Sequence, residues 1–317
     1  MTKLDPVKLS PAFKDYLWGG VRLKSDFNKS CDLERVAESW ELSAHKDGQS
    51  VISGGVYDGL PLSAYIDAVG KDALGRNCEK YDYFPLLIKL IDAKGDLSVQ
   101  VHPSDEYALA HEGEYGKTEM WYILDCEEGA SLYYGFSRSV SREEYENAIR
   151  EGRLTEILNK VNVKRGDVFF IPAGTVHAIG AGILICEIQQ NSNTTYRVYD
   201  YLRRDKDGHL RPLHVEKALE VSCLGQSPDL PRIGDGDDVL LAECGYFTVR
   251  RLRLNGTGEV TADTSSFVSL MVTEGYGTLA YSGGTLSFAK GDSLFIPAQD
   301  ARLEITGSCE LILSRVN

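Results

Sequence analysis

The chain has 317 residues, of which 43% are apolar and 26% charged, the balance of an ordinary globular protein long enough for two domains. Its 34 Lys and Arg residues against 47 Asp and Glu give a net charge of −13, which repels polyphosphate backbones and argues against a nucleic-acid partner. Apolar stretches such as residues 168–173 are too short to cross a bilayer, and the N-terminus lacks the apolar core of a signal peptide, so we expect a cytoplasmic protein with no membrane partner.

Most of the chain predicts short β-strands separated by turns, and we expect a mainly β fold. The predicted strands are rich in β-branched or aromatic residues and include 39–43, 83–91, 97–102 and 120–124. Helical patterns are fewer, and we predict them at about 61–80, 141–160 and 212–224. The second of these opens with a capping box, in which Ser141 is the N-cap and Glu144 follows three residues later.

One segment is repeated within the chain. Residues 166–177, GDVFFIPAGTVH, reappear as residues 291–302, GDSLFIPAQDAR, with six identities in register. A tight Gly-Asp turn, a buried strand and a proline at its end form one structural device used twice, so we infer a duplication. His177 of the first copy is matched by Arg302 in the second, so only one half is expected to hold a metal.

This repeat predicts two β-rich halves, residues 1–225 and 226–317, joined by the turn-rich stretch 225–231. The first half carries the three helical segments as insertions. The seven cysteines are scattered and never spaced as Cys-x-x-Cys, which indicates neither a disulfide framework nor a thiolate zinc site.

Four polar residues near strand ends are candidate metal ligands. Gln100 and His102 lie two apart on one predicted strand, so both project from the same face. Glu119 begins another strand, and His177 follows the strand that ends at Pro172. A single histidine on a strand is more often structural, but a polar Gln-x-His inside an apolar strand is costly without a role. Two imidazoles, a carboxylate and an amide oxygen suit zinc, and also manganese, cobalt or ferrous iron.

Several motifs resemble signature segments of the type I mannose-6-phosphate isomerases, in their compact bacterial form. They are LSVQVHP (97–103), GKTEMWY (116–122), IPAGTVHAI (171–179) and TYRVYDY (195–201). Residues 18–20 and 38–43 resemble the opening segments of that family, and the resemblance runs from about Leu9 to the end. It implies a cupin fold of two jelly-roll β-barrel halves, the second degenerate, one zinc ion, and interconversion of mannose 6-phosphate and fructose 6-phosphate.

Carried over residue by residue, the resemblance places zinc on Gln100, His102, Glu119 and His177. It implies a catalytic role for Arg197, and a place in the substrate pocket for Lys117, Lys89, Asp200 and Trp18. The sequence departs from the larger members at Thr118, where they often have proline, and this puts the local turn in doubt rather than the ligand beside it.

Aldose–ketose isomerisation through an enediol needs charge stabilisation, a proton shuttle and a grip on the phosphate. The guanidinium of Arg197 stays protonated at neutral pH, so we expect an electrostatic role for it. Lys117, two residues from a predicted ligand, is a candidate proton shuttle, although a metal-bound water or an acidic side chain would also serve. Lys89, Lys117 and Arg197 would form a basic island for the phosphate, unless Lys89 and Arg197 pair with surface carboxylates.

Two other functions stay open on the sequence. Two His and one carboxylate on a barrel-like fold also form the triad of ferrous-iron oxygenases, although Gln100 and the nearby Lys117 argue against that reaction. A non-catalytic sugar-phosphate sensor would keep the pocket without turnover. The expected partner is a small sugar phosphate, and we expect a monomer or weak homo-oligomer.

Overall fold

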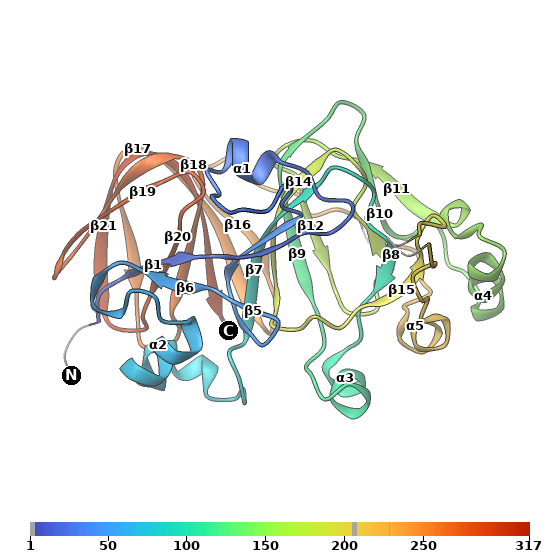
Figure 1. The fold of residues 1–317 in the computed structure, drawn as a ribbon, viewed down its shortest axis with the longest axis horizontal. Coiled ribbons are helices and arrows are strands. Elements are labelled where there is room, and N and C mark those ends of the chain that lie inside the picture. The colour runs from blue at the N-terminus through green and yellow to red at the C-terminus, as the bar shows by residue number, and fades with distance from the viewer. Residues whose placement is uncertain (1–3, 205–207, 228) are drawn as a thin grey trace. The chain divides into compact units, whose positions relative to one another are not determined.

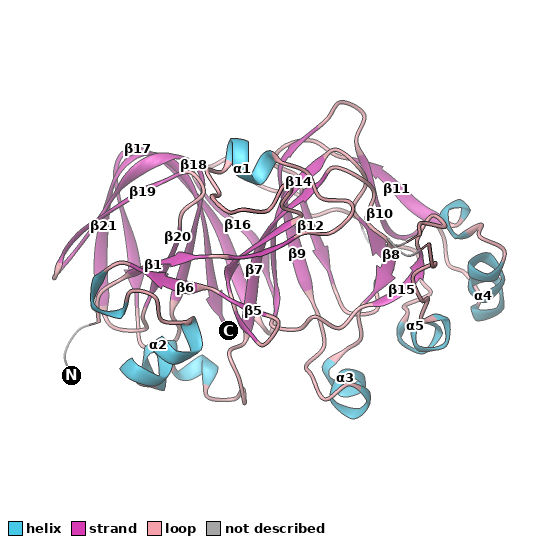
Figure 2. Ribbon diagram, in the orientation of Figure 1, coloured by secondary structure: helices cyan, strands magenta, loops and turns pink. Residues whose placement is uncertain are grey.

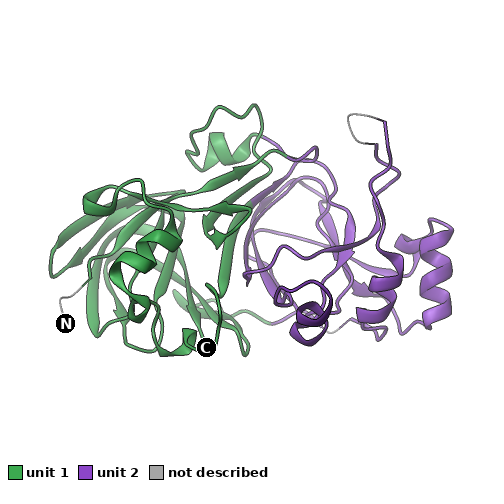
Figure 3. Cartoon of the chain, turned by 60° about the horizontal axis from the view of Figure 1, so that its bottom comes forward, with its two compact units in different colours: residues 1–15, 21–90, 232–317 green, residues 16–20, 91–231 purple. Residues whose placement is uncertain are grey.

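The computed structural model describes residues 4–204, 208–227 and 229–317, and strands dominate its elements (Figures 1 and 2). This confirms the predicted mainly β fold. The chain divides into two compact units (Figure 3): unit 1 holds residues 1–15, 21–90 and 232–317, and unit 2 holds residues 16–20 and 91–231. The units do not follow chain order as the predicted halves do, because most of the first 90 residues group with the C-terminal segment.

Unit 1 is built on one 8-stranded sheet with the order β16-β17-β21-β18-β20-β1-β6, in which β19 also pairs with β18. The order is an open path rather than a closed barrel. Its strands are β1 (Val7–Ser10), β6 (Val51–Ser53), β16 (Asp238–Glu243), β17 (Phe247–Ala262), β18 (Val268–Tyr281), β19 (Gly284–Ala289), β20 (Ser293–Ile296) and β21 (Ala301–Val316). Strand β1 pairs antiparallel with both β20 and β6, and this pairing explains why the N-terminal residues belong to the same unit as the C-terminal ones.

The remaining elements of unit 1 are short strands and helices. They are β2 (Ala12–Lys14), β3 (Glu38–Leu42), β4 (Ala44–His45), β5 (Gly48–Gln49), α1 (Arg22–Asp26), α2 (Leu62–Val69), the 3-10 turns η1 (Gly55–Tyr57), η2 (Lys71–Leu74) and η3 (Arg76–Cys78), and β7 (Leu86–Ala93), within which the unit ends. Helix α2 and the two turns after it occupy the segment predicted as helical at 61–80.

Unit 2 holds two groups of antiparallel strands. One is a 5-stranded sheet with the order β11-β10-β13-β8-β15. The other joins β12, β9 and β14 side by side. The bounds are β8 (Val99–Val101), β9 (Glu119–Cys126), β10 (Ser131–Phe136), β11 (Leu158–Asn162), β12 (Val168–Ile171), β13 (His177–Ala178), β14 (Ile183–Gln190), β15 (Tyr196–Tyr199), α3 (Asp105–His111), α4 (Arg142–Arg150), η4 (Leu154–Glu156) and α5 (Val215–Val221).

Helices α4 and α5 occur where the sequence predicts helices, whereas α3 was not predicted. The Ser141 hydroxyl accepts a hydrogen bond from the Glu144 amide at 3.0 Å, which is one half of the predicted capping box, while the Glu144 carboxylate pairs with Arg138. Both helices contribute to a core that also contains Val99 and Val101 of β8. Because side chains alternate along a strand, Gln100 between these two valines projects from the opposite face of the sheet. The helices therefore leave that face for polar residues.

The repeated segment forms the same turn in both places. It leads into β12 in the first copy and into β20 in the second. The turn glycines, Gly166 and Gly291, have φ of 88° and 95°. In each copy the following aspartate, Asp167 or Asp292, accepts a hydrogen bond at 2.9 Å from the backbone N–H three residues earlier. The shared geometry supports the inferred duplication.

Replacing Gly291 by alanine is expected to destabilise the protein more than replacing Gly166. Both positions have positive φ, so each variant carries backbone strain of about 1–3 kcal/mol. At Gly291 a Cβ atom would also lie 2.0 Å from the Phe27 carbonyl oxygen, whereas nothing lies within 4 Å at Gly166. Chemical denaturation of both variants measures the difference in the free energy of unfolding. Equal losses of unfolding free energy in the two variants would show that the backbone at Phe27 moves aside for the added Cβ atom without cost.

Within the described ranges no helix has the length and apolar character needed to cross a membrane. The seven cysteines all lie within the described ranges, and none of them forms a disulfide bond.

Candidate metal centre

The predicted ligands come from three strands of unit 2, namely β8 with the residue that follows it, β9 and β13. Gln100 lies in the middle of β8, and His102 follows it at the strand end. His177 begins β13 and pairs directly with Gln100, which on its other side pairs with Arg197 of β15. Directly opposed residues of antiparallel strands project from the same face, so these three side chains form one row across the sheet. Glu119 begins β9, in the other group of strands.

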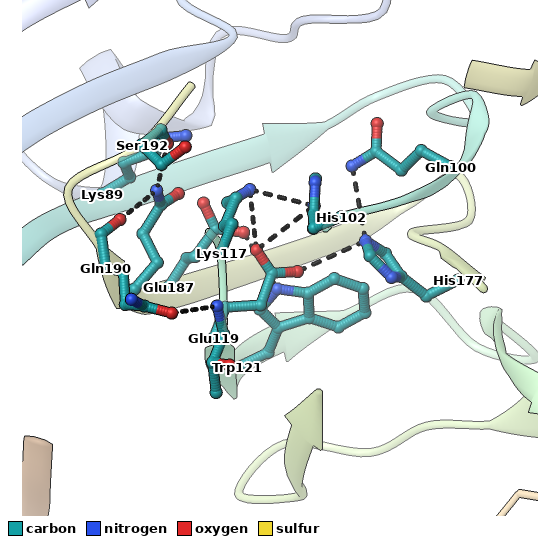
Figure 4. A network of polar contacts seen from close by, with 12 residues as sticks. Lys89, Gln100, His102, Lys117, Glu119, Trp121, His177, Glu187, Gln190 and Ser192 are labelled. Atoms are coloured by element: carbon teal, nitrogen blue, oxygen red, sulfur yellow. Dashed lines mark hydrogen bonds and ion pairs between the residues drawn. The ribbon is translucent and has the colours of Figure 1, made fainter. Parts of the chain in front are cut away.

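Three of the four predicted ligands come together in a buried cluster (Figure 4). One ligand atom each of His102, Glu119 and His177 lie within 4.8 Å of one another. The Nε2 atom of His177 lies 3.3 Å from Glu119 Oε1, and that of His102 lies 3.6 Å from Oε2. All three residues are almost completely buried. Two imidazoles and a carboxylate converging at such distances form a donor set that fits a divalent cation.

Backbone carbonyls orient both imidazoles toward this centre. His102 Nδ1 lies 2.9 Å from the Thr194 carbonyl oxygen, and His177 Nδ1 lies 2.8 Å from that of Thr175. A carbonyl only accepts, so Nδ1 carries the proton in each ring and Nε2 keeps its lone pair toward Glu119. Histidine ligands of metals are commonly held in this way. Sequence reasoning missed these partners because every residue has a carbonyl, whatever its side chain.

Burial keeps His177 in the neutral form that a metal requires. Burial lowers the pKa of His177 to about 4, and the positive charge of Lys117 acts in the same direction, against the hydrogen bond to Thr175. The ring also packs edge-on against Trp121, with centroids 5.3 Å apart. His177 is therefore neutral at physiological pH before any metal binds.

Gln100 lies beside the cluster with its amide next to His177. Its Nε2 atom is 3.4 Å from His177 Nε2 (Figure 4). An amide has its oxygen and nitrogen at the same distance from the backbone, so a half-turn of the side-chain amide exchanges them. That half-turn would present Oε1 to the centre in place of the NH2 group.

Lys117 lies within the cluster. Its Nζ is 2.7 Å from Glu119 Oε2 and 3.2 Å from His102 Nε2. The lysine is buried, so its ammonium compensates the carboxylate charge in a place with little water. Lys117, which the sequence predicts as a candidate proton shuttle, therefore contacts two of the predicted metal ligands.

Arg197 is held at the edge of the sheet by its backbone and its guanidinium. Its Nε donates to Ser98 Oγ at 3.3 Å and its Nη1 to the Pro212 carbonyl at 3.2 Å. Its backbone N–H donates to His214 Nδ1 at 3.1 Å. Burial lowers the pKa of the Arg197 guanidinium, and the positive charge of Arg211 lowers it further. The pKa of an arginine lies so far above neutral pH that the guanidinium nevertheless stays protonated.

The other predicted pocket residues lie outside the cluster. Asp200 is buried and hydrogen-bonded to Arg203 and Arg211. The Trp18 ring lies 5.5 Å from that of Tyr16, and the Trp18 carbonyl accepts a hydrogen bond from Gly95. Lys89 belongs to unit 1, where its Nζ lies 3.7 Å from Glu38 Oε2 and 5.2 Å from the centre of the Trp40 ring. Their roles toward a substrate stay predictions.

A buried His–Glu–His cluster that could hold a metal ion, on paired β-strands, is the arrangement of the cupin class. The model of the type I phosphomannose isomerase catalytic domain matches residues 7–129, and that of the mannose-6-phosphate isomerase cupin domain matches residues 239–316. The chain therefore belongs to the type I mannose-6-phosphate isomerase family.

Full-length relatives agree with this assignment. The chain is 41% identical over 318 residues to mannose-6-phosphate isomerase ManA of Bacillus subtilis, covering 98% of this chain and 99% of that protein. It is 38% identical to the mannose-6-phosphate isomerase of Streptococcus mutans, covering 99% of both. The activity of the family is the interconversion of mannose 6-phosphate and fructose 6-phosphate, so the predicted aldose–ketose isomerase function is confirmed at this level.

Solved structures agree on the fold. The crystal structure of the Bacillus subtilis mannose 6-phosphate isomerase superposes with a TM-score of 0.90 at 38% identity, covering 98% of this chain and 99% of that one. A mannose 6-phosphate isomerase crystallised with zinc and yttrium reaches 0.80 at 17% identity, covering 99% of this chain and 100% of that one, and shows the fold alone. The family is metal-dependent, in keeping with the cluster in unit 2.

Proposed function

We propose that this chain isomerises mannose 6-phosphate and fructose 6-phosphate with one zinc ion held by His102, Glu119 and His177, and with Gln100 as fourth ligand. The observation that carries the proposal is the convergence of two imidazole Nε2 atoms on both oxygens of one buried carboxylate. Zinc accepts such nitrogen and oxygen donors, and manganese, cobalt or ferrous iron would fit the same set.

An ion held by these residues would supply Lewis-acid polarisation of the sugar carbonyl. The chain's own residues do the rest. Lys117 lies against the ligands at 2.7 Å from Glu119, and we assign it, as the neutral amine, removal of the proton from C2 of the aldose and, as the resulting ammonium, delivery of that proton to C1 of the enediol. Arg197 lies in the same row as Gln100 and His177, where its fixed positive charge stabilises the developing enediolate.

The burial of the centre favours this chemistry. His102, Lys117, Glu119 and His177 each expose only a small fraction of their surface. A site that excludes water strengthens each electrostatic interaction with the reacting oxygen atoms and protects an enediol from side reactions.

We also propose the partners, location and oligomeric state that the sequence predicts. The partner is a sugar phosphate, and we propose a cytoplasmic monomer or weak homo-oligomer without nucleic-acid or membrane partners. The net charge of −13 supports the exclusion of nucleic acid.

A coupled assay that detects fructose 6-phosphate tests the function. Turnover of mannose 6-phosphate is expected in metal-replete protein, its loss after treatment with a chelator, and its return when zinc is added. Elemental analysis of the same samples should give one equivalent of metal before treatment. Metal-replete protein without turnover would support the sensor instead, and oxygen consumption by iron-loaded protein would support the oxygenase.

A further inference from the structure

A buried glutamine holds the backbone between Lys117 and Glu119. Gln190 is the last residue of β14 and lies beside the segment that carries Glu119 (Figure 4). Its backbone N–H donates to the Thr118 carbonyl at 3.1 Å, and its side-chain Oε1 accepts from the Thr118 N–H at 2.8 Å. Both residues are more than nine-tenths buried. One glutamine thus binds both backbone polar groups of the residue that links a predicted metal ligand to the candidate proton shuttle.

Asp105 fixes the orientation of this side-chain amide. Gln190 Nε2 donates to Asp105 Oδ1 at 2.9 Å, and the Gly116 N–H donates to the same oxygen at 2.8 Å. A backbone N–H only donates and a carboxylate only accepts, so exchanging Oε1 and Nε2 of Gln190 would break both of its side-chain hydrogen bonds. The amide therefore has one orientation, in which it joins the first residue of α3 to the residue before β9.

The loop that leads to Lys117 is closed on the residues that follow His102. The Lys117 N–H donates to the Pro103 carbonyl at 3.0 Å. Gly116 packs so closely against the same stretch that an added Cβ atom would lie 2.4 Å from the Ser104 carbonyl carbon. The loop therefore leaves β8 just after one predicted ligand, His102, and returns to the same place just before the next one.

The contact between Lys117 and Glu119 depends on the backbone of Thr118. The Lys117 Nζ lies 2.7 Å from Glu119 Oε2, and two side chains separated by one residue meet only at certain backbone angles of that residue. The two bonds to Gln190 hold those angles, and the Thr118 hydroxyl is fixed as well, because it accepts from the Ala173 N–H at 3.3 Å. Proline, which the larger relatives often have at position 118, lacks the N–H and could not make the bond to Gln190 Oε1.

We propose that Gln190 is a positioning residue for the isomerase: through Thr118 it holds Glu119 in place as a metal ligand and keeps Lys117 against Glu119. Asp105 acts one step farther out, by fixing the amide of Gln190. This inference rests on the proposed function and adds to it, since its two side-chain hydrogen bonds show that Gln190 acts through the backbone. Partners of this kind usually contribute 10- to 100-fold to metal affinity or activity.

The first test compares Gln190→Met with the control Gln49→Met. Methionine is unbranched like glutamine but lacks the amide. Gln49, in unit 1, makes the same kind of bond, since its Oε1 accepts from the Ser63 N–H at 3.1 Å. The measurements are the zinc dissociation constant in competition with a chelator, kcat and KM at saturating zinc, and hydrogen exchange of residues 116–119 in zinc-free protein.

For Gln190→Met we expect zinc affinity and kcat each to fall by a factor of about 10 to 100. KM should change little, because Gln190 acts on the catalytic groups rather than on the sugar. The Thr118 amide should exchange faster, because it loses its acceptor. Gln49→Met should leave all of these quantities unchanged.

A second test exchanges the partners across the contact with Asp105. Gln190→Glu sets a carboxylate against that of Asp105 and should lose zinc affinity, whereas Asp105→Asn keeps an oxygen for the Gln190 amide and should change little. In the double variant the new asparagine amide can donate to the new carboxylate. The double variant should therefore recover most of the zinc affinity and kcat that Gln190→Glu loses.

Other outcomes would overturn the proposal. A Gln190→Met protein that is easier to unfold but keeps its zinc affinity and kcat would show a structural role alone. An equal loss in the Gln49 control, or a double variant no better than Gln190→Glu, would also reject it. If Gln190→Met does not fold, the exchange of partners with Asp105 decides. Wild-type protein that binds zinc without turnover would reject only the proposed function, because zinc affinity and hydrogen exchange still measure the role of Gln190.

Discussion

Substituting His102 by alanine is expected to remove the metal and the isomerase activity together, while the fold survives. The imidazole supplies one of the two neutral nitrogen donors, and its Nε2 lies 3.6 Å from Glu119. Residues that merely orient metal ligands typically contribute 10- to 100-fold to metal affinity, so loss of a ligand itself should cost more than about 100-fold. Elemental analysis, the coupled assay and circular dichroism of the same preparation measure the three properties.

His111→Ala is the matched control. His111 is an exposed histidine of α3, stacked on Tyr107 away from the cluster. It should keep full metal content and turnover. A His102→Ala protein with normal metal stoichiometry and no activity would show that His102 has been wrongly assigned as a ligand.

Arg197→Ala is expected to keep the metal and lose turnover by a factor of about 100 to 1,000, the usual cost of removing one preorganised electrostatic contact with the transition state. Arg197 is oriented through Ser98 and Pro212, and none of its hydrogen bonds reaches His102, Glu119 or His177. The effect should therefore fall mainly on kcat.

The control is Arg150→Ala, which removes an exposed arginine of α4 paired with Glu146. Single-turnover kinetics of both variants, together with zinc content, distinguish loss of chemistry from loss of metal. Near-normal turnover of Arg197→Ala would remove this residue from the mechanism. Loss of zinc would instead give it a structural role at the metal centre.

Local sequence patterns predicted the strands better than the helices. The Gly-Asp turn repeated at residues 166 and 291 has the same hydrogen bond in both copies, because the glycine adopts the positive φ and the aspartate accepts from the amide three residues earlier. Helix α3 escaped prediction, although Ser104 caps it by accepting a hydrogen bond from Tyr107, because Ala108 is its one buried residue. Such a segment shows too few apolar positions for a clear helical period.

Residue types and the alternation of side chains along a strand made part of the candidate site predictable from the sequence. Gln-x-His on one strand, with Glu119 and His177 elsewhere, and the family resemblance named the four residues. The carbonyls of Thr175 and Thr194 were not predictable, because they act through the backbone. The role of Asp200 was open for another reason: its partners Arg203 and Arg211 reach it only through the turn and the return of the chain after β15.

The sequence by itself determined the mainly β fold, the repeated turn and the chemical types of the candidate metal donors, since each follows from local composition and spacing. The family came from the resemblance of whole motifs to signature segments. Only the tertiary structure decided that β1 pairs with β20, that His177, Gln100 and Arg197 share one row, and that Lys117 lies at the metal centre. The physical reason is that strand pairing joins residues distant in the chain, and a register shift of one residue would turn every side chain to the other face. Register is set by the packing of the whole sheet, which no local pattern contains.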